Sequence, residues 1–239
     1  MMFLNIEEIL SDLTSKQHEG MKKSYSKENQ TYAVIGVKMQ DIRALAKKIG
    51  IHHDLAIKLN DLNIYETMML STFIADRDQM TFDLLNKWAK RANQSSIIDQ
   101  GLAHLMLQVK DYQKLLEAWC VSSDKDLKYA GFTTLSGYFR LESLDQIDIH
   151  FGLNMLTDIE HTIVTEPLSI QNAMNNAVVM AGLHVPHLVE KAYEVAEKIG
   201  YILPLKARNS CNIQSALDYL NRYITQPKFS RVAKIKEAK

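Results

Sequence analysis

Apolar residues recur at the spacing of helix turns along nearly the whole chain. The clearest case is the segment 36–50, where Ile42, Leu45, Ala46 and Ile49 occupy positions i, i+3, i+4 and i+7, and a terminal glycine supplies a helix stop. No segment reads convincingly as a strand. The same pattern predicts further helices at His53 to Leu59, Tyr65 to Ala75, Thr81 to Ala89, Ile97 to Val109 and Tyr112 to Val121.

The breaks between these predicted helices are short and polar. Residues 60–63, 76–78, 93–96 and 122–124 are mostly Asn, Asp and Ser, which cap helices and form turns. Only 4 Pro and 9 Gly occur in 239 residues, so few positions interrupt a helix. No break resembles an interdomain linker.

Helix pairs recur at roughly 35 to 45 residues, the period of HEAT-type and similar solenoids, although exact self-similarity is weak. We therefore predict an all-α fold, a right-handed superhelical solenoid of HEAT-like helix pairs with a concave face. The prediction is a single domain over residues 1–239, with a basic C-terminal tail at about 226–239. The alternative is an irregular helical globule.

Composition excludes several classes of protein. With 46% hydrophobic residues the chain can bury a large core, and no run of about 18 apolar residues suggests a membrane span. We expect a cytoplasmic protein, nucleoid-associated when it binds DNA. Cys120 and Cys211 lie far apart without zinc spacing, which indicates reduced, structural cysteines. Histidine spacing and the absence of phosphate-loop and nucleophile-elbow motifs predict no metal and no cofactor.

Positive charge is unevenly distributed although the formal net charge is zero. From residue 206 onward eight Lys and Arg face two acids, a net charge of +6, so residues 1–205 carry −6. A basic end is compatible with phosphate contact and equally with a solvated tail.

Further basic residues lie near the ends of the predicted helices. Lys90 and Arg91 are placed to complement the dipole at the end of one helix. In a solenoid, however, equivalent helices line one surface, so their basic residues can form a track that suits a DNA backbone. The predicted phosphate contacts are Lys38, Arg43, Lys128, Arg140, Lys206 and Arg208.

Gly36-Val37 followed by residues 42–47 (Ile-Arg-Ala-Leu-Ala-Lys) resembles the DNA alkylation repair enzyme family, the HEAT-like-repeat alkylpurine DNA glycosylases. Residues 115–119 (Leu-Leu-Glu-Ala-Trp), with the acidic turn at 122–124 and the basic helix that follows, look like a second family segment. Residues 170–178 lie where the family has another helix facing its DNA. The resemblance spans about residues 30 to 225.

The resemblance implies that duplex DNA lies on a concave helical surface and that positively charged alkylated purines are removed without full extrusion of the base. In that chemistry a carboxylate stabilises the positive charge that develops on the deoxyribose. Aromatic faces pack on the sugar and on the cationic lesion. Some members of the superfamily bind branched DNA without excising bases.

Residue by residue, the resemblance carries over only in part. Asp99 matches the family's aspartate. The first tryptophan falls on Ser95, the arginine on Lys128 or Tyr129, and the second tryptophan on Asn176. Lysine keeps the charge of arginine but lacks its planar fork. Tyr129 is the nearest candidate to replace a lost ring.

Asp99 also has a structural interpretation, and so do the two tryptophans of the chain. Ser96 and Asp99 form an S-x-x-D spacing before an apolar helix, where an acid caps backbone N–H groups. Trp88 and Trp119 follow helical apolar spacing, which predicts core positions.

Three asparagines on one predicted helix are open to two interpretations. Asn172, Asn175 and Asn176 are poor helix formers that could bond phosphate or sugar if they face a groove. The alternative is a polar helix–helix contact. Lys206 and Arg208 lie in a polar, basic segment that could approach a phosphate or serve only as a connector.

These observations predict a monomeric DNA-binding protein of the DNA alkylation repair superfamily, with duplex, damaged or branched DNA as its partner and no membrane contact. We expect base excision to be reduced, altered or absent, because the family's aromatic and arginine site residues are not matched. The alternative is an active glycosylase that uses Asp99 to remove cationic N3- or N7-alkylated purines. A third hypothesis is a protein-binding solenoid, which an exposed patch of Met and Leu would favour.

Overall fold

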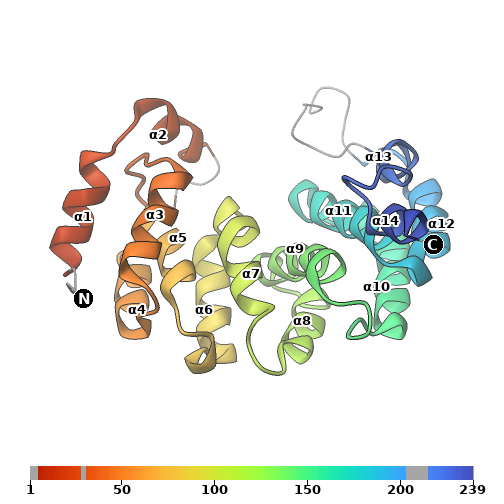
Figure 1. Cartoon of the computed structure of the whole chain (residues 1–239), viewed down its shortest axis with the longest axis horizontal. Helices are drawn as coiled ribbons and strands as arrows, with labels where there is room; N and C mark the ends of the chain where they lie inside the picture. The colour runs from red at the N-terminus through yellow and green to blue at the C-terminus, as the bar shows by residue number, and fades with distance from the viewer. Residues whose placement is uncertain (1–4, 28–30, 203–214, 239) are drawn as a thin grey trace. The chain divides into compact units, whose positions relative to one another are not determined.

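The computed structural model of the protein describes residues 5–27, 31–202 and 215–238 (Figure 1). Contacts along the chain divide it into two compact units, Met1–Leu115 and Leu116–Lys239. The described residues are helical apart from loops and two isolated bridges, Ala33 with Ile64 and Tyr201 with Ser215. The all-α prediction is therefore confirmed, and the single-domain prediction stays a prediction.

In the first unit the residues at the helix ends set where the helices begin and end, as α6 illustrates. The helix α6 begins after Thr81, whose Oγ1 accepts a hydrogen bond from Leu84 N at 3.2 Å, and it ends at Asn93 in the left-handed conformation. The described helices are α1 (Ile6–Ser15), α2 (Glu19–Tyr25), α3 (Met39–Ile49), α4 (His53–Asp61), α5 (Tyr65–Ile74), η1 (Arg77–Gln79), α6 (Phe82–Ala92), η2 (Ile98–Leu102) and α7 (Ala103–Met106). Helix α8 (Tyr112–Cys120) spans the boundary between the units.

Helix α5 is the central helix of the first unit. Nine of its ten residues are buried, and α3, α4 and η2 pack against it. One of the buried residues is Glu66, whose carboxylate accepts hydrogen bonds from the backbone N–H groups of Ile35, Gly36 and Val37. A buried charge is tolerated where hydrogen bonds compensate it, so Glu66 fixes the extended segment before α3 to the core.

The helix predicted at 97–109 differs from the structure in its first turn. Residues Ile98–Leu102 form the π-helical segment η2, and only Ala103–Met106 continue as the α-helix α7. At Gly101 an added Cβ would lie 2.2 Å from Thr72 Oγ1, so α5 approaches the backbone of η2 closely. A helical period alone does not reveal such a local change of pitch.

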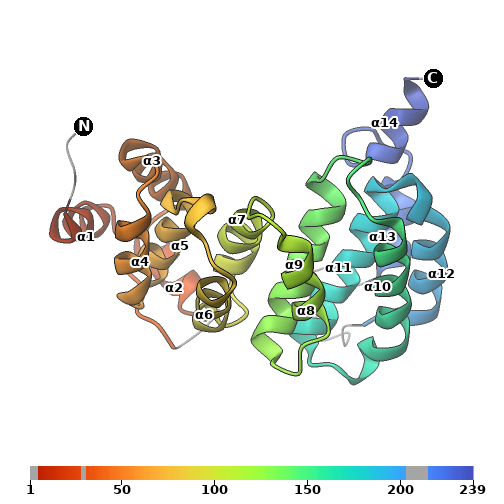
Figure 2. The same cartoon turned by 90° about the horizontal axis from the view of Figure 1, so that it is seen from below.

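In the second unit α11 is the central helix. Ten of its 17 residues are buried, and it packs against α9, α12, α13 and α14 (Figure 2). At Gly182 an added Cβ would lie 2.7 Å from Leu220 Cδ2, so the helices meet closely there. The described elements are α9 (Lys125–Leu141), α10 (Ile149–Thr162), η3 (Ile163–Thr165), α11 (Leu168–His184), η4 (Pro186–Leu188), α12 (Val189–Ile199), α13 (Ala216–Tyr223) and α14 (Arg231–Glu237).

Helices α9 and α11 run parallel, side by side. Near their first turns Lys128 Nζ lies 2.7 Å from Glu166 Oε1. In their last turns Arg140 and His184 line one cavity. The N-terminal ends of both helices therefore lie at one edge of the unit and the C-terminal ends at the other.

The basic chain end is a folded helix rather than a loose tail. Val232 and Ala233 of α14 are buried, and Ser230 Oγ donates a hydrogen bond to the carbonyl oxygen of Leu183 at 3.0 Å. The helix thus packs onto the end of α11 and brings its lysines to a defined place.

The predicted core tryptophans are confirmed, since Trp88 and Trp119 are each 1% exposed. Cys120 is also buried, and burial raises the pKa of its thiol, as suits a structural cysteine. Cys211 lies outside the described residues. Among the helices described, none has the length and apolar character needed to cross a membrane.

Candidate nucleic-acid interface

In the second unit, positive charge gathers at the C-terminal ends of α9 and α11. Arg140 in the last turn of α9 and His184 in the last turn of α11 line a cavity of about 180 Å³. Its other walls come from the segment that leads into α14 and from the first turns of that helix. They are formed by Pro227, Lys228, Phe229, Ser230, Arg231 and Lys234. We call this the C-terminal cavity.

Arg231 lines the cavity and is bonded to the end of α9. Its guanidinium donates hydrogen bonds to the backbone carbonyl oxygens of Glu142 at 2.7 Å, of Phe139 at 3.5 Å and of Arg140. The last carbonyls of a helix lack partners within the helix, and cations are favoured beside them. Burial lowers the pKa of Arg231, and its role at α9 is structural.

The remaining cations of the cavity are not neutralised by acids. Among the described residues, no ion pair joins Arg140, Lys228 or Lys234 to a carboxylate. The pKa of His184 is lowered to about 4, first by burial and then by the charges of Arg231, Arg140 and Lys234. The imidazole is therefore neutral at pH 7, and the cavity has an uncompensated positive potential that favours anions.

Aromatic rings adjoin the cavity. Lys228 Nζ lies 5.3 Å from the ring centroid of Phe229, which is 38% exposed. The ring of Phe229 packs edge-on against that of Tyr223, with the ring centroids 4.7 Å apart, and the ring centroids of Tyr223 and Tyr219 are 4.4 Å apart. Exposed rings beside cations can stack with nucleic-acid bases while the cations contact phosphates.

Lys128, the residue that replaces the family's arginine, is paired within the unit. Its ammonium lies 2.7 Å from Glu166, and the two side chains are 21% and 15% exposed. Tyr129 beside it is half-buried. Arg140 lies about 18 Å further along α9 at the helical rise, so one phosphate cannot contact both Lys128 and Arg140.

The asparagines of α11 are turned toward the interior. Asn172 and Asn176 lie one turn apart, and their Oδ1 atoms are buried without a hydrogen-bond partner in the described part of the chain. Asn175 between them is fully buried. This placement favours the helix–helix alternative, and their contact with DNA stays a prediction.

In the first unit, Lys38 and Arg43 are exposed on α3, where Lys38 is the N-cap residue. The guanidinium of Arg43 lies 5.7 Å from the ring centroid of Phe73 on α5, which orients it at the surface. Both side chains are accessible to a phosphate.

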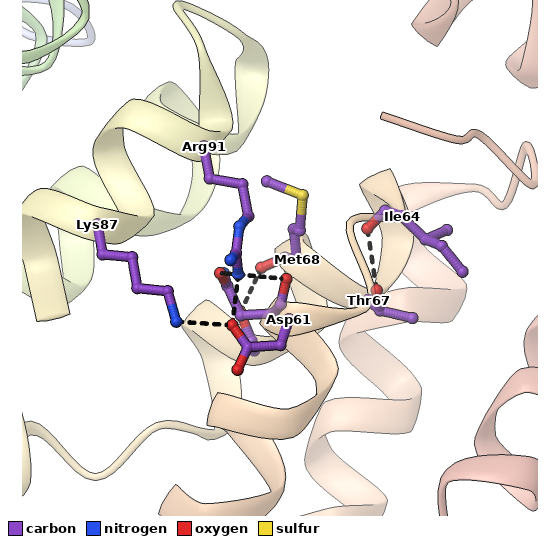
Figure 3. A network of polar contacts seen from close by, with 8 residues as sticks. Asp61, Ile64, Thr67, Met68, Lys87 and Arg91 are labelled. Atoms are coloured by element: carbon purple, nitrogen blue, oxygen red, sulfur yellow. Dashed lines mark hydrogen bonds and ion pairs between the residues drawn. The ribbon is translucent and has the colours of Figure 1, made fainter. Parts of the chain in front are cut away.

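Other basic residues of this unit are engaged within the fold (Figure 3). Arg91 Nη1 donates hydrogen bonds to Asp61 Oδ1 at 2.7 Å and to both the backbone and side-chain oxygens of Asn60 at 2.9 Å. Lys87 Nζ lies 2.9 Å from the same Asp61 oxygen. Hydrogen bonds from Lys87 and Arg91 lower the pKa of Asp61. Because both donors lie on α6 and Asp61 lies on α4, these bonds join the two helices.

Asp99 is exposed on the π-helical segment η2 of the first unit. Ser95, at the position of the family's first tryptophan, is 2% exposed, and its hydroxyl donates to the carbonyl oxygen of Ala92 at 2.6 Å. That position is thus interior and presents no ring to a ligand. π-Helical turns often occur at functional sites, which keeps Asp99 a candidate.

The described residues contain no group of three or more His, Cys, Asp and Glu side chains that could hold a metal ion. Lys206 and Arg208 lie outside the described residues. The sequence pattern alone does not bring His184, Lys228, Arg231 and Lys234 together as one site. The basic chain end was the available signal, but only the packing of α14 brings these residues to α9 and α11.

Comparison with known proteins gives three results. The family model of the DNA alkylation repair enzyme matches residues 6–220. An uncharacterized protein of Listeria monocytogenes is 24% identical over 191 residues, 78% of this chain and 82% of that protein, and one of Listeria innocua is 22% identical over the same lengths.

A solved structure described as a new family related to the HEAT-like repeat DNA glycosylases, with affinity for branched DNA structures, superposes with a TM-score of 0.86. The two sequences are 22% identical, and the superposition covers 96% of this chain and 98% of the other. The fold is thus of the HEAT-like repeat type that helix and loop lengths predict.

Proposed function

Since the chain belongs to the DNA alkylation repair enzyme family, we propose that it binds DNA through the phosphate backbone and that the surface around the C-terminal cavity is a principal contact. The observation that carries this proposal is the group of cations at Arg140, Lys228 and Lys234, which have no acidic partner among the described residues. Unpaired lysines and arginines release counterions when they bind phosphates, and this release drives association with DNA.

Further phosphate contacts come from exposed cations elsewhere. Lys38 and Arg43 on α3 are the candidates in the first unit. Lys128 is a weaker candidate because Glu166 already balances its charge. We propose branched DNA as the preferred form, since the structural neighbour is described as having affinity for branched DNA structures.

The test measures fluorescence anisotropy of a labelled four-way junction and of a duplex of the same strands across a series of salt concentrations. The affinity for both DNAs should fall as the salt concentration rises, and the affinity for the junction should be higher than that for the duplex. Arg140→Gln should flatten the salt slope by about one unit, as expected for one lost phosphate contact. Lys125→Gln, at the opposite end of α9, is the matched control. An affinity that does not change with salt would refute the proposal.

Base excision is the second candidate function, favoured by the exposure of Asp99 on η2. We propose that excision is weak or absent, because the positions of the family's tryptophans are a buried serine and a half-buried asparagine. Single-turnover release of 7-methylguanine from duplex DNA tests this, with Asp99→Asn compared with Asp83→Asn, an exposed acid on α6. Release that only Asp99→Asn abolishes would establish a glycosylase instead.

A protein-binding function has less support. Among the described residues, the exposed large apolar side chains include no methionine. The exposed leucines are distributed over three helix ends: Leu62 after α4, Leu141 and Leu144 at the end of α9, and Leu168 at the start of α11. A contiguous apolar patch would be expected for a protein partner. We propose a monomer in the cytoplasm.

A further inference from the structure

We propose that the C-terminal cavity binds the terminal phosphate group of a DNA strand, held by Arg140, Lys228, Arg231 and Lys234, with the adjoining nucleotide against Phe229. This inference rests on the proposed function only for the source of the phosphate. The affinity of the cavity for a phosphate group follows from its own residues.

The charges that face the cavity are all positive or neutral. Arg140 enters from α9, His184 from α11, and Arg231 and Lys234 from α14. Glu142, whose backbone oxygen accepts a hydrogen bond from Arg231 and whose negative charge also acts on Arg231, does not line the cavity. Four side-chain cations around one small space therefore repel one another until an anion enters.

The cavity is built on fixed elements. Arg231 is held by carbonyl oxygens of α9, and Ser230 by a carbonyl oxygen of α11. These bonds orient the first turn of α14, from which Lys234 projects one turn later. A site whose backbone and one guanidinium are already held in place spends less free energy on ordering them when the ligand binds.

The size of the cavity limits the ligand to a small group. Its volume is about 180 Å³, whereas pockets for whole small molecules span about 300 to 1,000 Å³. A phosphate group fits this space, and the sugar and base of a nucleotide remain outside. The half-exposed ring of Phe229 lies at the wall, where a base can stack on it.

Charge favours a terminal phosphate over an internal one. A phosphate monoester carries about −1.5 to −2 at pH 7, whereas the internal diester carries a single negative charge. Each cation of the cavity therefore interacts up to about twice as strongly with the monoester. Branched DNA with an open arm supplies such an end, and so does a nicked strand.

His184 provides a direct readout because it lines the cavity. Inorganic phosphate is titrated at pH 7.5 into the full-length protein while the ¹H–¹³C signals of the histidine rings are followed by NMR, and His184→Gln identifies the signal. We expect a saturable shift of that signal. The pKa of His184, lowered to about 4 in the free protein, should rise by about one unit or more in sulfate, which stays a dianion in acid.

Two lysines of α14 supply the matched variants. Lys234 lines the cavity, whereas Lys236, two residues along the same helix, does not. Lys234→Gln should weaken the binding of inorganic phosphate roughly tenfold, and Lys236→Gln should leave it unchanged. No shift of the His184 signal with phosphate, or equal loss in both variants, would overturn the proposal.

The DNA source is tested with two oligonucleotides of one sequence, one with a 5′-phosphate and one with a 5′-hydroxyl. Tighter binding of the phosphorylated strand, lost in Lys234→Gln and displaced by inorganic phosphate, supports the proposal. Equal binding of the two strands, with a His184 shift from inorganic phosphate, would assign the cavity to free phosphate and refute the DNA end. A His184 shift without any DNA binding would refute the proposed function together with the DNA end, whereas equal binding of the two strands would refute the DNA end alone.

Discussion

Glu66 Oε1 lies 2.7 Å from the backbone nitrogen of Gly36 and 3.1 Å from that of Val37, while its other oxygen lies 2.9 Å from Ile35 N. One fully buried carboxylate thus satisfies three consecutive backbone N–H groups of the segment that leads into α3. The Gly36-Val37 pair that carries the family resemblance is therefore a backbone anchor on α5.

Replacing this carboxylate should destabilise the protein strongly. In Glu66→Gln the amide nitrogen cannot accept a hydrogen bond, so at least one buried N–H loses its partner and the charge-assisted bonds become neutral. We expect a loss of about 2 to 4 kcal/mol in the free energy of unfolding, measured by urea denaturation. Glu117→Gln, at an exposed position of α8, should change it by less than about 0.5 kcal/mol. Equal effects would contradict the anchor.

Gly36 is required for its backbone conformation and for space. Its φ is 100°, and an added Cβ would lie 2.6 Å from Lys22 Cβ and 2.7 Å from Lys22 N. Gly36→Ala should therefore cost about 1 to 3 kcal/mol more than Gly50→Ala, which has φ 75° but no atom within 4 Å of the new Cβ. Thermal unfolding of both variants measures the difference. Similar midpoints would show that the segment moves away from α2 without cost.

The pair Lys128–Glu166 should restrain DNA binding. Glu166→Gln removes the negative charge 2.7 Å from the ammonium and makes Lys128 available to a phosphate. We expect a several-fold gain in DNA affinity and a salt slope about one unit steeper, by fluorescence anisotropy. Glu190→Gln, an exposed acid on α12, is the control for net charge. A gain in Glu166→Gln that persists in the double variant with Lys128→Gln would assign the effect to general charge.

Stability should decrease in mild acid because of His184. Its pKa is lowered from 6.5 to about 4 in the folded protein, so between these values the unfolded chain binds a proton that the folded chain does not. The contribution of His184 to the free energy of unfolding therefore decreases as the pH falls from about 6.5 to about 4. Urea denaturation across this range should show a smaller pH dependence in His184→Gln. His161→Gln, at an exposed position, should retain the dependence of the natural protein.

Local signals account for most of the helix predictions. Four predicted helices correspond to α4, α5, α6 and α8, and their predicted bounds lie within a few residues of the observed ones. The agreement arises because capping and turn residues lie next to these helices in the sequence, as Thr81 and Asn93 do for α6. The prediction of an α-helix directly after Ile97 is wrong, because residues Ile98–Leu102 form a π-helical segment. Its π pitch coincides with the close approach of Thr72 to Gly101, which is a tertiary contact.

The candidate site was less predictable for the same physical reason. Arg140 was identified from its place at a helix end, but Lys228 and Lys234 lie some 90 residues later and meet it only because α14 packs on α11. Glu66 could have been found as the only charged residue in the apolar run of α5. The buried position of Ser95 depends on the whole unit, and an ungapped match cannot reveal it.

The docking of α14 makes the basic chain end part of the fold of the second unit. A chain cut before Ser230 would lose Arg231 and Lys234 together with the groups that bond the last carbonyl oxygens of α9 and the Leu183 carbonyl of α11. Deletion would therefore fray the last turns of α9 and α11 and also remove two of the proposed phosphate contacts. Residues 226–238 therefore connect the integrity of this unit to its charge.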